Sequence, residues 1–97
     1  MNGMTLKKFL KTLVNYDEIE FSCNGVQYNF QKENSDGGTL KISVWQSGNK
    51  IPCYSVEVKN NLSLIKTAAQ NLIDAKIFPD GKSIAEAEKD IEIEFFT

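Results

Sequence analysis

A short polar turn between two alternating stretches constrains this chain most strongly. Asn24-Gly25 interrupts the segment 19–30, and both residues tolerate the positive φ angles of a two-residue type I′ turn. The turn predicts three apolar pairs: Cys23 with Val26, Phe21 with Tyr28 and Ile19 with Phe30. Because opposed residues share a face of a sheet, the turn and the hydrophobic pattern fix the same register. We therefore expect an antiparallel hairpin over residues 18–31 with one apolar face.

Two further stretches, residues 40–45 and 54–58, alternate in the same way and predict a second hairpin. We expect a three-residue loop at 47–49, because a two-residue loop would place polar side chains on the apolar face. This loop predicts three cross-strand pairs: Gln46 with Lys50, Ile42 with Tyr54 and Leu40 with Val56. Residues 32–39 are polar and include Asp36-Gly37-Gly38, so we expect a flexible connection between the two hairpins.

Three stretches carry the spacing of helices. Residues 6–14 place apolar side chains three and four apart behind a capping Thr5, and residues 62–76 do so behind Asn60-Asn61. The sequence Ser83-Ile84-Ala85-Glu86 fits a capping box and predicts a short helix over 83–89. Residues 91–95 alternate as a strand should, although residues 84–95 also fit one continuous helix.

These elements predict an α+β fold for a single domain spanning residues 1–97. We expect a mainly antiparallel sheet of four to five strands from two consecutive hairpins, with two helices packed on one face. The expected order is α-β-β-β-β-α-(α)-β. A length of 97 residues with 41% hydrophobic residues suits one modest core. Met4 is a candidate natural start, so the sequence leaves open whether residues 1–3 are native.

The composition excludes several kinds of site. Every basic residue is lysine and histidine is absent, so the commonest neutral-pH base and the bidentate phosphate contacts of arginine are missing. The net charge of −2 argues against nucleic acid as a partner. Cys23 and Cys53 stand in no CxxC motif and are expected on opposite faces of the sheet as free thiols. We expect no cofactor, no metal, no membrane span and a cytoplasmic location.

A patch on the second face of the sheet is the leading candidate for function. The expected register brings Trp45 and Ile51 together there, close to Cys53. A tryptophan beside another large apolar side chain is typical of a protein-binding hot spot. We therefore predict a non-enzymatic domain that acts through protein–protein interaction, with another protein or a second copy as its partner. Two alternatives stay open: the C-terminal segment covers the patch, or the patch is exposed without a partner.

Clusters of like charge give the alternative sites. Nucleic-acid binding would be carried by four lysines, which are Lys7, Lys8, Lys11 and Lys66. A solvated helix face explains the first three equally well. From Asp80 onward the chain holds six acids against two lysines, an acidic surface that could occupy a basic groove of a nucleic-acid-binding protein.

Paired acids are the weakest candidates for chemistry. Asp17 with Glu18, and Glu92 with Glu94, lie in alternating positions that are expected to be exposed. Cys23 is expected to be buried. We therefore predict no catalytic residues.

Three stretches carry resemblances to known proteins. Met4–Leu10 and Tyr16–Phe21 are similar to the start of small phage and mobile-element proteins of low-GC Gram-positive bacteria, which implies a bacterial accessory protein. The small, acidic helix-strand-helix architecture is also similar to that of some anti-CRISPR inhibitors. Thr67–Leu72 resembles the alanine-rich second helix of double-stranded-RNA-binding domains, which implies nucleic-acid binding. The lysine cluster of that family is reduced here to Lys66, and an extra strand is present.

Overall fold

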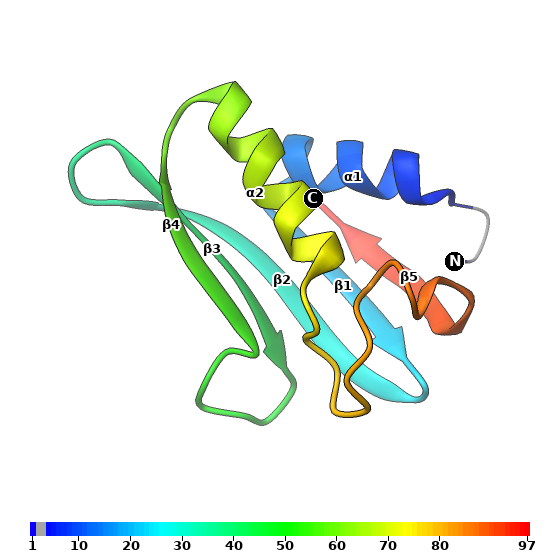
Figure 1. The fold of residues 1–97 in the computed structure, drawn as a ribbon. Coiled ribbons are helices and arrows are strands. Elements are labelled where there is room, and N and C mark those ends of the chain that lie inside the picture. The colour runs from blue at the N-terminus through cyan, green and yellow to red at the C-terminus, as the bar shows by residue number, and fades with distance from the viewer. Residues whose placement is uncertain (2–3) are drawn as a thin grey trace.

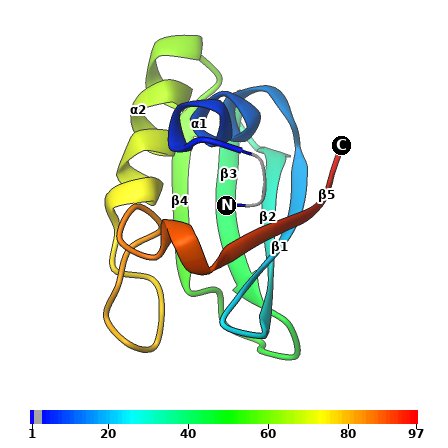
Figure 2. The same cartoon turned by 90° about the vertical axis from the view of Figure 1, so that its right-hand side faces the viewer.

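The chain forms an antiparallel sheet with two helices on one of its faces, as the computed structural model shows for residues 1 and 4–97 (Figures 1 and 2). The elements in chain order are α1 (Leu6–Asn15), β1 (Glu18–Cys23), β2 (Val26–Ser35), β3 (Thr39–Gln46), β4 (Tyr54–Lys59), α2 (Leu62–Asp74), a 3₁₀ helix (Glu88–Asp90) and β5 (Ile91–Phe96). The predicted α+β class and element order are confirmed. Residues 2–3, which belong to the segment before the candidate start at Met4, lie outside the described residues.

The hairpin of β1 and β2 forms in the predicted register. Asn24 and Gly25 have φ angles of 52° and 80°, which is what a type I′ turn requires. The three expected pairs all form: Cys23 with Val26, Phe21 with Tyr28 and Ile19 with Phe30. Five of these six side chains are buried and Val26 is half-buried, and all six face the helices. The turn chemistry and the apolar pattern therefore determine the centre of the sheet.

The polar connection expected at residues 32–39 is instead mostly strand. β2 continues to Ser35 and β3 begins at Thr39, with Asp36-Gly37-Gly38 as the turn between them. Lys32 explains part of this difference, because its ammonium group donates to the carbonyls of Leu13 and Val14 at the end of α1. A polar side chain on the core face thus closes a helix terminus and does not end the strand.

The predicted pairing of β3 with β4 is wrong by two residues. Ile42 lies opposite Val56, and not opposite Tyr54, while Tyr54 lies opposite Val44. The connecting loop accordingly spans residues 47–53 and includes Pro52. A shift of two residues keeps every side chain on its own face, so the hydrophobic pattern could not distinguish the two registers.

Both helices begin at the predicted caps. The Thr5 hydroxyl accepts a hydrogen bond from the Lys8 amide at 3.1 Å, and the Asn61 amide oxygen accepts from the Leu64 amide at 3.2 Å. The apolar stripe of α1 delivers Phe9 and Leu13 to the core, where they are 0% and 1% exposed. The stripe of α2 delivers five residues: Ile65, Ala68, Ala69, Leu72 and Ile73. Leu62, the first residue of that stripe, stays exposed.

The C-terminal region contains a capping box without the α-helix predicted over 83–89. The Ser83 amide donates to the Glu86 carboxylate, the Glu86 amide donates to the Ser83 hydroxyl, and only a turn and the 3₁₀ helix follow. The chain must reach Ile91 in time to pair β5 with β1, which leaves no room for a longer helix.

Strand β5 forms the edge of the sheet farthest from β4, in the order β4-β3-β2-β1-β5 (Figure 1). The alternative of one continuous helix over residues 84–95 is therefore wrong. The alternative in which the C-terminal segment covers Trp45 is wrong too, because β2 and β1 lie between that segment and β3.

Candidate functional site

Trp45 lies on the sheet face that points away from the helices, opposite Asn29 of β2. Its indole N–H donates to the Ser43 hydroxyl at 3.0 Å, so the ring lies along its own strand. The ring is half-buried, and Ser43 beneath it is only 1% exposed. The Asn29 side-chain oxygen is buried and accepts no hydrogen bond from the described residues. Trp45 therefore already packs on its own sheet, which leaves less of its ring to a partner.

The structure does not bring Ile51 and Trp45 together as the predicted register required. Ile51 lies in the loop at 47–53 and is 79% exposed. Cys53 is the residue that continues the ladder, since its amide donates to the Val44 carbonyl at 2.9 Å. The Cys53 thiol donates to the same carbonyl at 3.2 Å, and burial raises its pKa. The predicted cluster of three residues thus separates into a packed tryptophan, a free isoleucine and an unreactive thiol.

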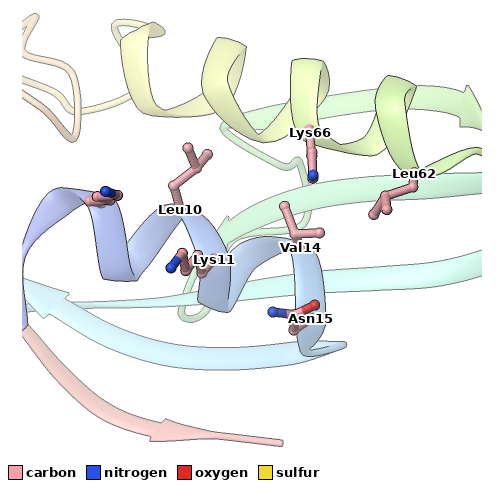
Figure 3. Close-up of a pocket in the computed structure, with 7 residues that line it drawn as sticks. Leu10, Lys11, Val14, Asn15, Leu62 and Lys66 are labelled. Carbon is pink, nitrogen blue, oxygen red and sulfur yellow. The ribbon is translucent and has the colours of Figure 1, made fainter.

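A groove between α1 and α2 is the best-formed concave surface among the described residues. It has a volume of about 480 Å³ and is lined by Lys7, Leu10, Lys11, Val14, Asn15, Leu62 and Lys66. Figure 3 shows Leu10 and Val14 pointing from α1 toward α2, with Leu62 and Lys66 on the opposite wall. Three of the four lysines predicted as an alternative site meet here. Lys8 does not line the groove and is exposed on α1.

The helical repeat explains how these residues come together. Leu10 and Val14 are one turn apart on α1, as are Lys7 and Lys11, and each pair lies on one side of the helix. Leu62 and Lys66 are likewise one turn apart on α2. Phe9 and Leu13 fill the core below, so the half-buried Leu10 and Val14 remain at the edge of the apolar stripe. The groove therefore has an apolar floor between two walls that carry ammonium groups.

The charge of the groove is positive and uncompensated. The ion pairs found among residues 1 and 4–97 join Lys32 to Asp17, at 3.9 Å, and Lys76 to Glu86, so neither uses a groove lysine. None of the lining residues is acidic. Burial lowers the pKa of Lys32 and nearby Asp17 opposes that shift, whereas the three groove lysines are exposed. These ammonium groups are available to an anionic ligand.

The groove extends along the seam between the two helices. A second hollow of about 360 Å³ shares Lys7 and Leu10 with it and continues toward the N-terminal end of α1. This extension is lined in addition by Leu6, Gln70, Ile73, Asp74 and Ala85. Because Asp74 is the acidic residue in this lining, the furrow is basic at the Leu62 end and mixed in charge at the other.

The acidic residues of the C-terminal region serve several separate contacts. The carboxylate of Glu86 accepts from the Lys76 ammonium group and from the Ser83 amide, which together lower its pKa to about 2. Glu94 in β5 accepts from the Gln27 amide group. Glu92 lies in the same strand, opposite Ser22. These acids are distributed over a turn and an edge strand.

The remaining chemistry-bearing residues stay apart. Asp17 lies 3.9 Å from Lys32, and Cys23 and Cys53 are free thiols, Cys23 buried and Cys53 exposed. Within the described residues, no three His, Cys, Asp or Glu side chains gather in a way that could hold a metal ion. In the same part of the chain, no helix is long and apolar enough to cross a bilayer.

No protein-family model, curated protein or solved structure matches this chain. The candidate site is therefore defined by its own geometry. Sequence reasoning identified three of its lysines but missed its apolar floor, which is formed by Leu10, Val14 and Leu62. The available signal was the width of the α1 stripe, which exceeds what Phe9 and Leu13 need to reach the core.

Proposed function

We propose that this protein is a non-enzymatic domain that acts by binding another protein, and that the groove between α1 and α2 is the surface that binds. The observation that carries the proposal is an apolar floor between two walls that bear unpaired ammonium groups. Leu62 on the rim is 59% exposed, although it belongs to the apolar stripe of its helix. An exposed leucine beside a concave apolar surface is typical of an interaction site.

The groove supports this function better than the surface around Trp45. The Trp45 indole is half-buried on its own strand and its N–H already has a partner, so a second protein would gain less from covering it. Ile51 is separated from it by the register of β3 and β4. The predicted function is thus kept, and its proposed location moves to the helical layer.

Nucleic-acid binding is the second candidate, because Lys7, Lys11 and Lys66 converge on one surface. The apolar floor between these lysines argues against it, since phosphates and sugars would leave the leucine and valine side chains uncovered. The lining also contains no aromatic side chain on which an unpaired base could stack. The same proposal places the protein in a bacterial cytoplasm, which the free thiols of Cys23 and Cys53 support.

A display selection on the full chain tests the proposal. A library of random peptides is selected in parallel on the wild type, on Lys11→Glu/Lys66→Glu and on Trp45→Ala. We expect the wild type and Trp45→Ala to retain the same peptides and the groove variant to lose them. Peptides that bind the groove variant but not Trp45→Ala would move the site to the sheet. A wild type that selects no peptide yet binds duplex RNA in a gel shift at low salt would replace protein binding with nucleic-acid binding.

A further inference from the structure

We infer that the groove receives one amphipathic α-helix of a partner protein, with an apolar stripe toward α1 and α2 and carboxylates on both flanks of that stripe. This inference rests on the proposed function and names the chemistry of the partner. It concerns the shape of the bound element and the sign of its charge, which protein binding alone leaves undefined.

The walls of the groove favour a helix over an extended segment. A partner strand is held by main-chain hydrogen bonds to a free sheet edge, whereas both walls here are helices whose backbone groups bond within themselves. A polyproline segment is held by aromatic side chains, and the lining has none. A third helix can instead lay its apolar face between two others, in the manner of amphipathic helices in hydrophobic grooves.

The length of the seam sets the length of the partner helix. Helix α1 has ten residues, and a rise of about 1.5 Å per residue gives a seam of about 15 Å. The groove and its extension run along this seam, since they share Lys7 and Leu10. A partner helix of about three turns would therefore cover the apolar floor from Leu62 to Leu6.

The positions of the lysines set the positions of the partner's acids. Lys7 and Lys11 lie on the α1 wall and Lys66 lies on the α2 wall, so ammonium groups flank the floor on both sides. Asp74 lies at the far end of the extension. The N-terminus of α2, with its positive end of the helix dipole, lies at the Leu62 end. We therefore expect the partner's carboxylates to concentrate at the end that meets Lys11 and Lys66.

A designed peptide tests this with the full chain. The probe is a fluorescently labelled helix of about 12 residues with leucines three and four apart and glutamates on both flanks. Its affinity is measured by anisotropy for the wild type, for Lys11→Glu/Lys66→Glu and for the matched control Lys50→Glu/Lys89→Glu, which makes the same charge change at exposed positions elsewhere. We expect the groove variant to weaken binding about tenfold or more and the control to leave it within about twofold.

Two further peptides complete the test. The first replaces the flanking glutamates with lysines, and we expect it to bind Lys11→Glu/Lys66→Glu better than the wild type. The second has the same composition in an order that is not amphipathic as a helix. Circular dichroism and Trp45 fluorescence confirm that each variant is folded.

The outcomes separate this inference from the proposed function. Equal binding of the glutamate helix and the reordered peptide, with both lost in the groove variant, would overturn the helix and retain protein binding at the groove. The same conclusion follows if the glutamate helix fails to bind while display-selected peptides bind the groove. A glutamate helix that binds the groove variant and the wild type equally would overturn the inferred charge pattern. Failure of all peptides together with binding of duplex RNA would overturn both proposals.

Discussion

Truncation of one exposed and one buried leucine of the same helix measures whether the groove is built for binding or for stability. Leu62 is 59% exposed and Leu72 is 0% exposed, and both belong to the apolar stripe of α2. Burying a whole leucine side chain contributes about 1.5–3 kcal/mol, so the buried part of Leu62 contributes about 1 kcal/mol or less. Leu72→Ala removes a fully buried side chain and leaves a cavity, which costs about 2–5 kcal/mol.

Urea denaturation of the wild type, Leu62→Ala and Leu72→Ala, followed by Trp45 fluorescence, gives the two free energies of unfolding. We expect a loss of no more than about 1 kcal/mol for Leu62→Ala and at least twice that for Leu72→Ala. Thermal melting should agree, because about 1 kcal/mol shifts Tm by roughly 4–8 °C in a domain of this size. If Leu62→Ala costs as much as Leu72→Ala, then Leu62 is a core residue and the reasoning from its exposure fails.

Three further predictions follow from the turn, the capping box and the thiols. Gly25 has a φ of 80° and open space around its α-carbon, so Gly25→Ala should lower the free energy of unfolding in urea by about 1 kcal/mol through backbone strain alone; an unchanged midpoint would contradict this. The pKa of Glu86 falls from 4.5 to about 2 on folding, so its contribution to stability is present above pH 4.5 and is lost as the pH falls toward 2. The difference in Tm between the wild type and Glu86→Gln should therefore shrink from pH 5 to pH 3, and a difference independent of pH would refute the link to this carboxylate. In a titration with a thiol reagent, exposed Cys53 should react in the native protein, whereas Cys23, which is 4% exposed and whose pKa is raised by burial, should react only on unfolding; rapid reaction of both thiols would contradict the burial of Cys23.

The parts of the fold that the sequence predicts correctly are those with two independent signals. The hairpin around Asn24-Gly25 has both turn chemistry and apolar alternation, and its register is confirmed. Each helix has both a cap and an apolar stripe, and each begins at the expected residue. Agreement between a local and a long-range signal is what fixes an element along the chain.

The errors in the fold arise where a single signal had to decide. The face pattern of β3 and β4 is the same for registers that differ by two residues, so Ile42 was assigned the wrong partner. The polar residues after Gln31 indicated a loop because nothing local shows that Lys32 reaches the end of α1. The capping box at Ser83 and Glu86 formed, but the following helix was prevented by the early start of β5.

The candidate site was only partly predictable for a similar reason. Lys7 and Lys11 are one helical turn apart, so the sequence alone places them on one wall. Lys66 and Leu62 come from a helix that follows the four-stranded segment, and only the packing of α2 beside α1 brings them to the same groove. The prediction at Trp45 and Ile51 depended on the register of β3 and β4, and it changed when that register changed.

Mapping of a bound peptide onto the isotopically labelled chain tests the central claim most directly. Amide chemical shifts are recorded while the glutamate helix is titrated into the full chain. The proposal predicts that the largest changes fall on residues that line the groove, led by Leu10, Lys11, Leu62 and Lys66, with no progressive change at Trp45. Changes centred on Trp45 and the loop at 47–53, with the groove amides unmoved, would contradict it.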